Sequence, residues 1–86
     1  MKWTRTYPKT PDTYWWSRGR YKDGKIEGPV IICADVNVDG TLVYFFFGDT
    51  EVMTPAEFKE RHEICEAVAE FAGPIVPPEE DEVEEQ

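Results

Sequence analysis

The stretch "VIICADVNVDGTLVYFFF", residues 30–47, decides the fold. Two apolar runs flank Asp39-Gly40, and Asp-Gly between apolar runs is typical of the two-residue turn of a β-hairpin. Such a turn sets a register in which one wholly apolar face carries the pairs Val36–Val43, Ala34–Phe45 and Ile32–Phe47. A three-residue loop would shift this pairing and still bring plausible contacts together. Because the other face is mixed in polarity, we expect an antiparallel sheet that is fully covered on one side.

Part of this stretch, "DVNVDGTL" at residues 35–42, also begins like a calcium-binding loop. Such a loop needs a bidentate glutamate at its twelfth position to complete the coordination shell. Counted from Asp35, the twelfth position is Phe46, and the flanking runs alternate as strands do. The pattern therefore favours a hairpin turn over a calcium site.

A helix is predicted over residues 55–72. Thr54, Pro55 and Glu57 form the pattern of an N-cap, a first-turn proline and a capping box, and Gly73-Pro74 is a typical helix end. At helical spacing the apolar side would carry Phe58, Ile64, Cys65, Val68, Phe71 and Ala72. The opposite side would carry Glu60, Glu63, Glu66 and Glu70.

These elements predict an α+β fold: a small antiparallel sheet of three to four strands with one amphipathic helix packed on one face. Residues 14–21 suit a strand, and Asp23-Gly24 and Gly28-Pro29 are turn signals. The segment "PIVPP" (74–78) could add a short edge strand. We expect an irregular arm over 1–13, a single domain over 14–78 and a disordered acidic tail over 79–86.

The composition restricts the class of protein. Two cysteines in 86 residues do not make a disulfide framework, and no apolar run approaches the roughly 20 residues that span a bilayer. No signal-peptide pattern is evident, so we expect a reducing cytoplasm and no membrane association. The net charge is −9: residues 1–25 hold seven Lys or Arg against two Asp, whereas residues 26–86 hold two against sixteen acids.

The sequence offers little for catalysis or metal binding. His62 and Cys65 lie one helical turn apart and could begin a zinc site with Cys33, but no second paired motif accompanies them. A core cysteine beside an exposed histidine explains the spacing more simply. Ser17 has no partner pattern typical of a nucleophile. We therefore predict no enzyme activity, no cofactor and no metal.

The segment "YWWSRGRYK" (14–22) combines aromatic and basic residues. In a strand, Trp16, Arg18 and Arg20 share one face, and such a face could stack bases and neutralise phosphates of a single-stranded nucleic acid. The excess of acids in the rest of the chain opposes direct binding of a polyanion. The alternative is that one tryptophan fills the core while the arginines pair with nearby acids.

An acidic surface is the other feature of note. Dense acids on a rigid element can imitate the phosphates of DNA and occupy the nucleic-acid channel of another protein, although many such surfaces are only solvated. The residues that we predict to bind a partner protein are Asp49, Glu51, Glu60, Glu63, Glu66 and Glu70.

At "EFAGPIVPPEE" the chain resembles a group of small bacteriophage and prophage proteins of unknown function that end in an aromatic residue, Gly-Pro-Ile and Pro-Pro. The matching residues are Phe71, Gly73, Pro74, Ile75, Pro77 and Pro78. The resemblance implies an accessory phage gene whose product binds a host or defence protein in the bacterial cytoplasm. Together with the acidic surface, it predicts a non-enzymatic inhibitor of the anti-CRISPR kind, as a monomer or homodimer. Single-stranded nucleic-acid binding through residues 14–22 is the alternative.

Overall fold

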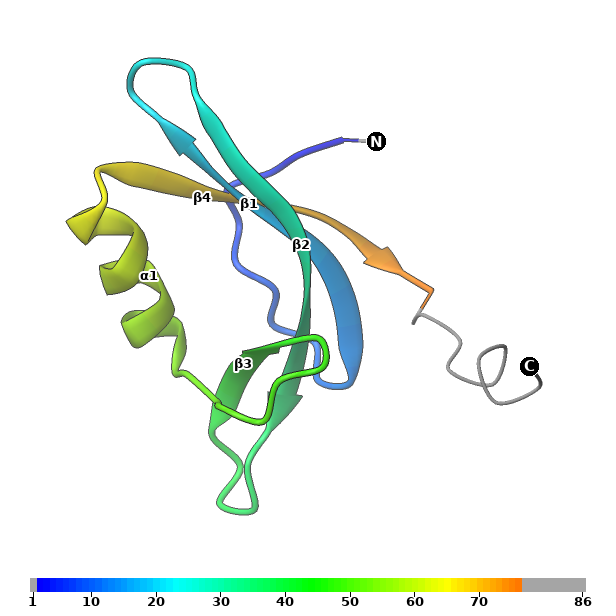
Figure 1. The fold of residues 1–86 in the computed structure, drawn as a ribbon. Helices are drawn as coiled ribbons and strands as arrows, with labels where there is room; N and C mark the ends of the chain where they lie inside the picture. The colour runs from blue at the N-terminus through cyan, green and yellow to red at the C-terminus, as the bar shows by residue number, and fades with distance from the viewer. Residues whose placement is uncertain (1, 77–86) are drawn as a thin grey trace.

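Four antiparallel strands and one helix make up the fold (Figure 1), and the structure, a computed structural model, describes residues 2–76. The elements in chain order are β1 (Thr13–Tyr21), β2 (Ile26–Val36), β3 (Leu42–Phe46), α1 (Pro55–Ile64) and β4 (Ala67–Ile75). They form a sheet of order β3-β2-β1-β4 with α1 packed against it, which confirms the predicted α+β class. The predicted acidic tail, 79–86, lies outside the described residues.

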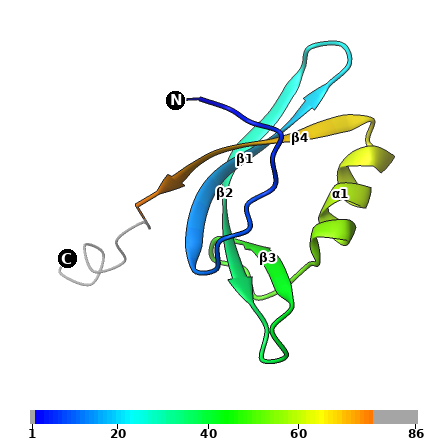
Figure 2. The ribbon, with the colours of Figure 1, turned by 180° about the vertical axis from the view of Figure 1, so that it is seen from behind.

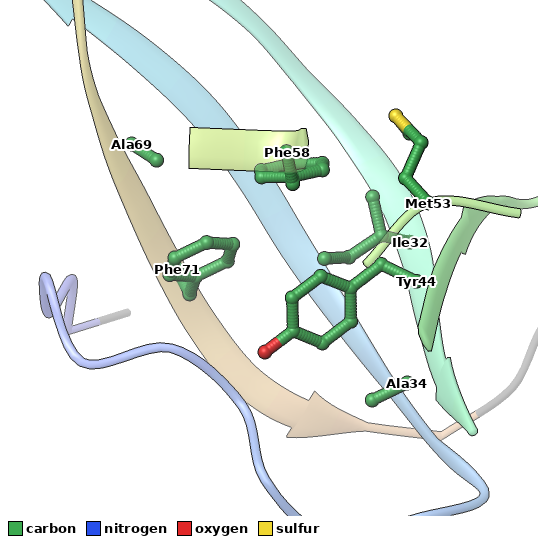
Figure 3. Packing of buried hydrophobic residues seen from close by; sticks show 7 residues of the cluster. All are labelled: Ile32, Ala34, Tyr44, Met53, Phe58, Ala69 and Phe71. Carbon is green, nitrogen blue, oxygen red and sulfur yellow. The ribbon is translucent and has the colours of Figure 1, made fainter. Parts of the chain in front are cut away.

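The core lies between α1 and one face of the sheet, and seven buried residues form its centre (Figure 3): Ile32, Ala34, Tyr44, Met53, Phe58, Ala69 and Phe71. Phe58 is the only buried residue of α1. Its ring centroid lies 5.6 Å from that of Tyr44 and 5.9 Å from that of Phe71. The helix therefore attaches to the sheet through one aromatic anchor rather than through the broad apolar stripe predicted.

The N-terminal arm closes one side of this core (Figure 2). Thr4 and Phe71 exchange two backbone hydrogen bonds, of 2.8 and 2.7 Å, so the arm pairs briefly with β4. The Tyr7 ring centroid lies 4.9 Å from that of Phe71, and the buried hydroxyl of Tyr44 donates to the carbonyl of Pro8. The described part of the arm holds none of the named strands or helices, and it contributes contacts to the core.

The hairpin forms where the sequence predicts it, but the predicted register is wrong by one residue. The observed pairs are Ile32–Phe46, Cys33–Phe45, Ala34–Tyr44, Asp35–Val43 and Val36–Leu42. The loop is longer than two residues, because the Asn37 amide donates to the Thr41 carbonyl and the Gly40 amide donates to the Asn37 carbonyl. A one-residue shift moves every side chain of a strand to the other face. Tyr44 therefore enters the core, and Val43 and Phe45 face the opposite side.

The predicted helix is too long. The capping box at Thr54 and Glu57 is present, but α1 ends at Ile64, and Glu66 adopts the left-handed conformation with φ of 58°. Residues 67–75 form β4, which pairs with β1. Residues 67–72 are apolar except for Glu70, a short run that fits a helix or a strand, and as a helix they would leave one edge of β1 without backbone partners. Pairing with β1 decides the conformation.

The two predicted turn signals before the hairpin have different outcomes. Asp23-Gly24 lies in the turn between β1 and β2, as predicted. Gly28-Pro29 lies inside β2, at an irregularity in the pairing with β1 near Ser17. A Cβ at Gly28 would lie 3.1 Å from the Ser17 carbonyl oxygen, so the backbones approach closely there. The glycine serves this close approach and not a chain reversal.

Candidate protein-binding surfaces

An ion-pair cluster joins β1 and β4 on the face of the sheet turned away from α1. The Nε atoms of Arg18 and Arg20 lie 2.8 and 3.3 Å from one carboxylate oxygen of Glu70. The Arg18 side chain is 15% exposed and that of Glu70 is 12% exposed. The Arg18 guanidinium also stacks on Trp3, 3.9 Å from the ring centroid. The cluster therefore fastens the arm and β4 to β1.

The cluster alters the titration of Glu70. Burial raises the pKa of its carboxyl, but hydrogen bonds and charge from Arg18 and Arg20 outweigh burial and hold the pKa below its ordinary value. Glu70 is therefore ionised at neutral pH, and its charge is neutralised inside the protein. The prediction that Glu70 lies on an exposed acidic helix face is wrong, because the residue belongs to β4 and is buried.

The surface predicted to bind single-stranded nucleic acid, Trp16, Arg18 and Arg20, is only partly exposed. Trp16, Arg18 and Arg20 share one face of β1, as the alternation predicts, but Glu70 lies between the two arginines. Trp15 packs against the core. The geometry matches the alternative in which one tryptophan fills the core and the arginines pair with an acid. Nucleic-acid binding stays a prediction, with only Arg20 substantially exposed among its two cations.

The remaining predicted acids are all exposed, and we call them together the acidic strip: Asp49, Glu51, Glu60, Glu63 and Glu66. Glu60 and Glu63 lie three residues apart on α1 and so point to neighbouring positions on one side of the helix, whereas Glu66 lies in the turn before β4. Lys59 lies 3.8 Å from Glu63, but both side chains are 64% exposed, and such a pair is weak. The strip is therefore strongly negative and in contact with solvent.

His62 and Cys65 lie beside a cleft of about 390 Å³ between α1 and strands β1 and β2. The His62 Nδ1 atom lies 3.0 Å from the Phe58 carbonyl oxygen. A carbonyl only accepts, so Nδ1 is the donor in this contact. Cys65 is exposed, contrary to its predicted place in the core, and Cys33 is buried.

The thiol of Cys33 is a poor nucleophile. Burial first, and then the charges of Asp35 and Asp12, raise the pKa of this thiol, so it remains protonated at neutral pH. Within residues 2–76 no group of three or more His, Cys, Asp or Glu could hold a metal ion. The absence of enzyme activity stays a prediction. Over the same residues, no helix is long and apolar enough to cross a membrane.

No protein family, no curated protein and no solved structure matches this chain. The contacts above are therefore the basis for any functional assignment.

Sequence reasoning missed the other residues of the sheet face that carries Trp16. Ile31 pairs with Trp16, and Phe45 and Phe47 lie on the same side through the observed hairpin register. The sequence allowed a three-residue loop in the hairpin as well as a two-residue turn. With the three-residue loop, Phe45 and Phe47 lie on the side of the sheet away from the core.

Proposed function

We propose that this protein is a non-enzymatic accessory protein of phage or prophage origin that binds a host or defence protein through the acidic strip. The observation that carries the proposal is the contrast between Glu70 and the strip. Glu70 is buried against two arginines, whereas Glu60, Glu63 and Glu66 are exposed, and the one ion pair described among them is the weak contact of Glu63 with Lys59. Exposed charge of one sign attracts a partner of the opposite sign from a distance and orients it.

The chemistry of the strip favours a basic partner that handles nucleic acid. Between Asp49 and Glu66 the chain carries six acids against two bases, Lys59 and Arg61. A channel that binds the phosphates of DNA or RNA is lined with Lys and Arg. Separated carboxylates on a protein surface would offer such a channel a series of negative charges in place of the phosphates. An inhibitor of a defence complex, of the anti-CRISPR kind, would act in this way.

The test is capture of a partner from nuclease-treated bacterial lysate by the immobilised full chain at moderate salt. The wild type should retain a nucleic-acid-handling protein that added duplex DNA displaces. The variant E60K/E63K should lose it. The matched control D23K/E27K changes the net charge equally but alters exposed acids of the β1–β2 hairpin, outside the strip.

The comparison of the two variants decides the outcome. Retention by D23K/E27K and loss by E60K/E63K supports the strip as the contact surface. Equal retention by both variants contradicts the proposal, as does equal loss, which would indicate that only net charge matters. Circular dichroism melting of all three proteins checks that the substitutions leave the fold intact.

A further inference from the structure

The face of the sheet turned away from α1, which we call the open face, carries large apolar side chains. Figures 1 and 2 show no helix or strand of the described chain over this side. The N-terminal arm reaches it at Arg18, on which Trp3 stacks, and leaves the region around Trp16 and Ile31 to the strands themselves. Strand alternation and the observed pairing place these residues at its centre: Trp16, Ile31, Cys33, Val43, Phe45 and Phe47. Apolar side chains gathered on one face in this way mark an interaction site more often than scattered ones do.

The burial pattern describes a continuous patch. Cys33 and Val43 are only 2% and 3% exposed, and Cys33 is paired with Phe45 across the two strands. Phe47 is 37% exposed, and its ring centroid lies 6.0 Å from that of Tyr14. Trp16 is half-buried. The aromatic side chains Trp16 and Phe47 are therefore partly in solvent, whereas Cys33 and Val43 on the same face are dry.

Two opposite charges, on Arg20 and Asp35, lie toward opposite ends of the open face at equal distances from the Trp16–Ile31 pair. Arg20 follows Trp16 by four residues along β1, and Asp35 follows Ile31 by four residues along β2. Trp16 and Ile31 are paired, and the two strands are antiparallel. At about 3.3 Å per residue, Arg20 and Asp35 therefore lie roughly 13 Å from the Trp16–Ile31 pair in opposite directions.

We propose that the open face is the two-fold interface of a homodimer. A two-fold axis that runs across the strands through the Trp16–Ile31 pair exchanges the two ends of the face. Arg20 of each copy then faces Asp35 of the other, so the contact is made twice. Trp16 lies near the axis and meets its own counterpart. The face is thus complementary to itself.

Charge also favours a second copy as the occupant of this face. The whole chain carries −9, so two copies repel one another over most of their surfaces. On the strands of the open face, Arg18 and Arg20 balance Glu70 and Asp35, and Asp12 adds one negative charge near Cys33. The face is therefore far less negative than the chain as a whole. Contact through this face leaves α1, with Glu60 and Glu63, on the outer side of each copy.

The size of the face predicts a weak dimer. The face is four strands wide, at about 4.8 Å per strand, and about six residues long, at about 3.3 Å per residue. As a flat surface it has an area of roughly 400 Å² per copy, without the additional area of protruding side chains. This lies at the low end of specific interfaces, so we expect a dissociation constant in the micromolar range.

The first test is sedimentation velocity of the full chain from about 1 to about 500 µM, a range that brackets a micromolar dimer. The wild type should pass from monomer to dimer. Trp16→Asp places two like charges together at the axis and should leave the protein monomeric throughout. Ile64→Asp is the matched control, because Ile64 is 74% exposed on α1 and lies outside the open face, and this variant should dimerise like the wild type.

The second test is a charge exchange that does not depend on the stability of the Trp16 variant. Arg20→Glu and Asp35→Arg should each weaken dimerisation by about tenfold or more, because each change affects two contacts. The double variant R20E/D35R should recover most of that loss, since the two positions would again carry opposite charges across the interface, with their signs exchanged.

Three results would overturn the proposal. The wild type could remain monomeric over the whole range, or Trp16→Asp could dimerise as well as Ile64→Asp. The double variant could also be as weak as the sum of the single ones. A chain ending at residue 76 that dimerises when the full chain does not would assign the open face to the C-terminal segment of the same chain.

Discussion

Replacing Glu70 by glutamine should destabilise the protein by roughly 2–3 kcal/mol at pH 7. The substitution keeps the shape of the side chain but removes the charge that pairs with Arg18 and Arg20. The Arg18 side chain is only 15% exposed, so its guanidinium cannot regain full hydration in the folded state. Breaking a fully buried ion pair costs about 3–5 kcal/mol, and the residual exposure of both partners here reduces that figure. For a domain of this size, the midpoint of thermal unfolding should fall by about 10–20 °C.

The same prediction has a pH dependence whose sign follows from the pKa of Glu70. The folded state holds this pKa below the ordinary value of 4.5. A carboxyl of this kind stabilises the fold above the unfolded pKa, and the contribution is lost as the pH falls through the folded pKa. The difference in stability between wild type and Glu70→Gln should therefore be constant from about pH 6 to 8 and shrink once the pH falls below about 4.5.

Urea denaturation followed by circular dichroism at several pH values measures both effects. The control is Glu66→Gln, an exposed acid in the turn before β4, which should change the unfolding free energy by less than about 0.5 kcal/mol. A Glu70→Gln protein as stable as this control would refute the reasoning. So would a stability difference that persists unchanged at low pH, because the loss would then come from packing and not from charge.

Two further substitutions test the core. Phe58→Ala removes the only buried side chain of α1 and should lower the free energy of unfolding, measured by urea denaturation, by about 3–5 kcal/mol. The control Val52→Ala, at an exposed position, should change it little. Equal small losses in the two variants would show that α1 is not anchored through Phe58. Tyr44→Phe removes the hydrogen bond to Pro8 and should cost about 1–2 kcal/mol at pH 7. Burial, and then the charge of Tyr7, raise the pKa of Tyr44 to about 12, so the wild type should lose stability relative to Tyr44→Phe as the pH rises from 10.0 through about 12. A stability difference between these two proteins that stays flat over that range would contradict the burial of the hydroxyl.

Local signals predicted the parts of the fold that short-range chemistry specifies. The capping box at Thr54 and Glu57 marks the start of α1, because a cap needs only the first turn of the helix. The alternation in β1 placed Trp16, Arg18 and Arg20 on one face, as the structure has them. A period of two is a property of the strand itself and needs no partner.

Segments that fit two patterns could not be assigned from the sequence. Residues 67–72 are apolar except for Glu70, so their pattern fits a helix or a strand, and the hairpin loop at Asp39-Gly40 admits two or three residues. The helical interpretation placed Glu70 on a solvated surface, so the ion pair with Arg18 was out of reach of sequence reasoning. The acids of the strip were predicted correctly as exposed, because their exposure does not depend on which interpretation holds.

The sequence alone thus determined the turns at Asp23-Gly24 and Asp39-Gly40, where the helix begins and which side chains of β1 share a face, since these depend on neighbours within a few residues. Only the tertiary structure decided that residues 67–75 form β4 and that Tyr44, rather than Phe45, enters the core. Both outcomes depend on groups far apart in the chain: the backbone of β1 needs partners along its second edge, and the hydroxyl of Tyr44 needs the carbonyl of Pro8. Long-range satisfaction of hydrogen bonds selects between local patterns that are otherwise equally acceptable.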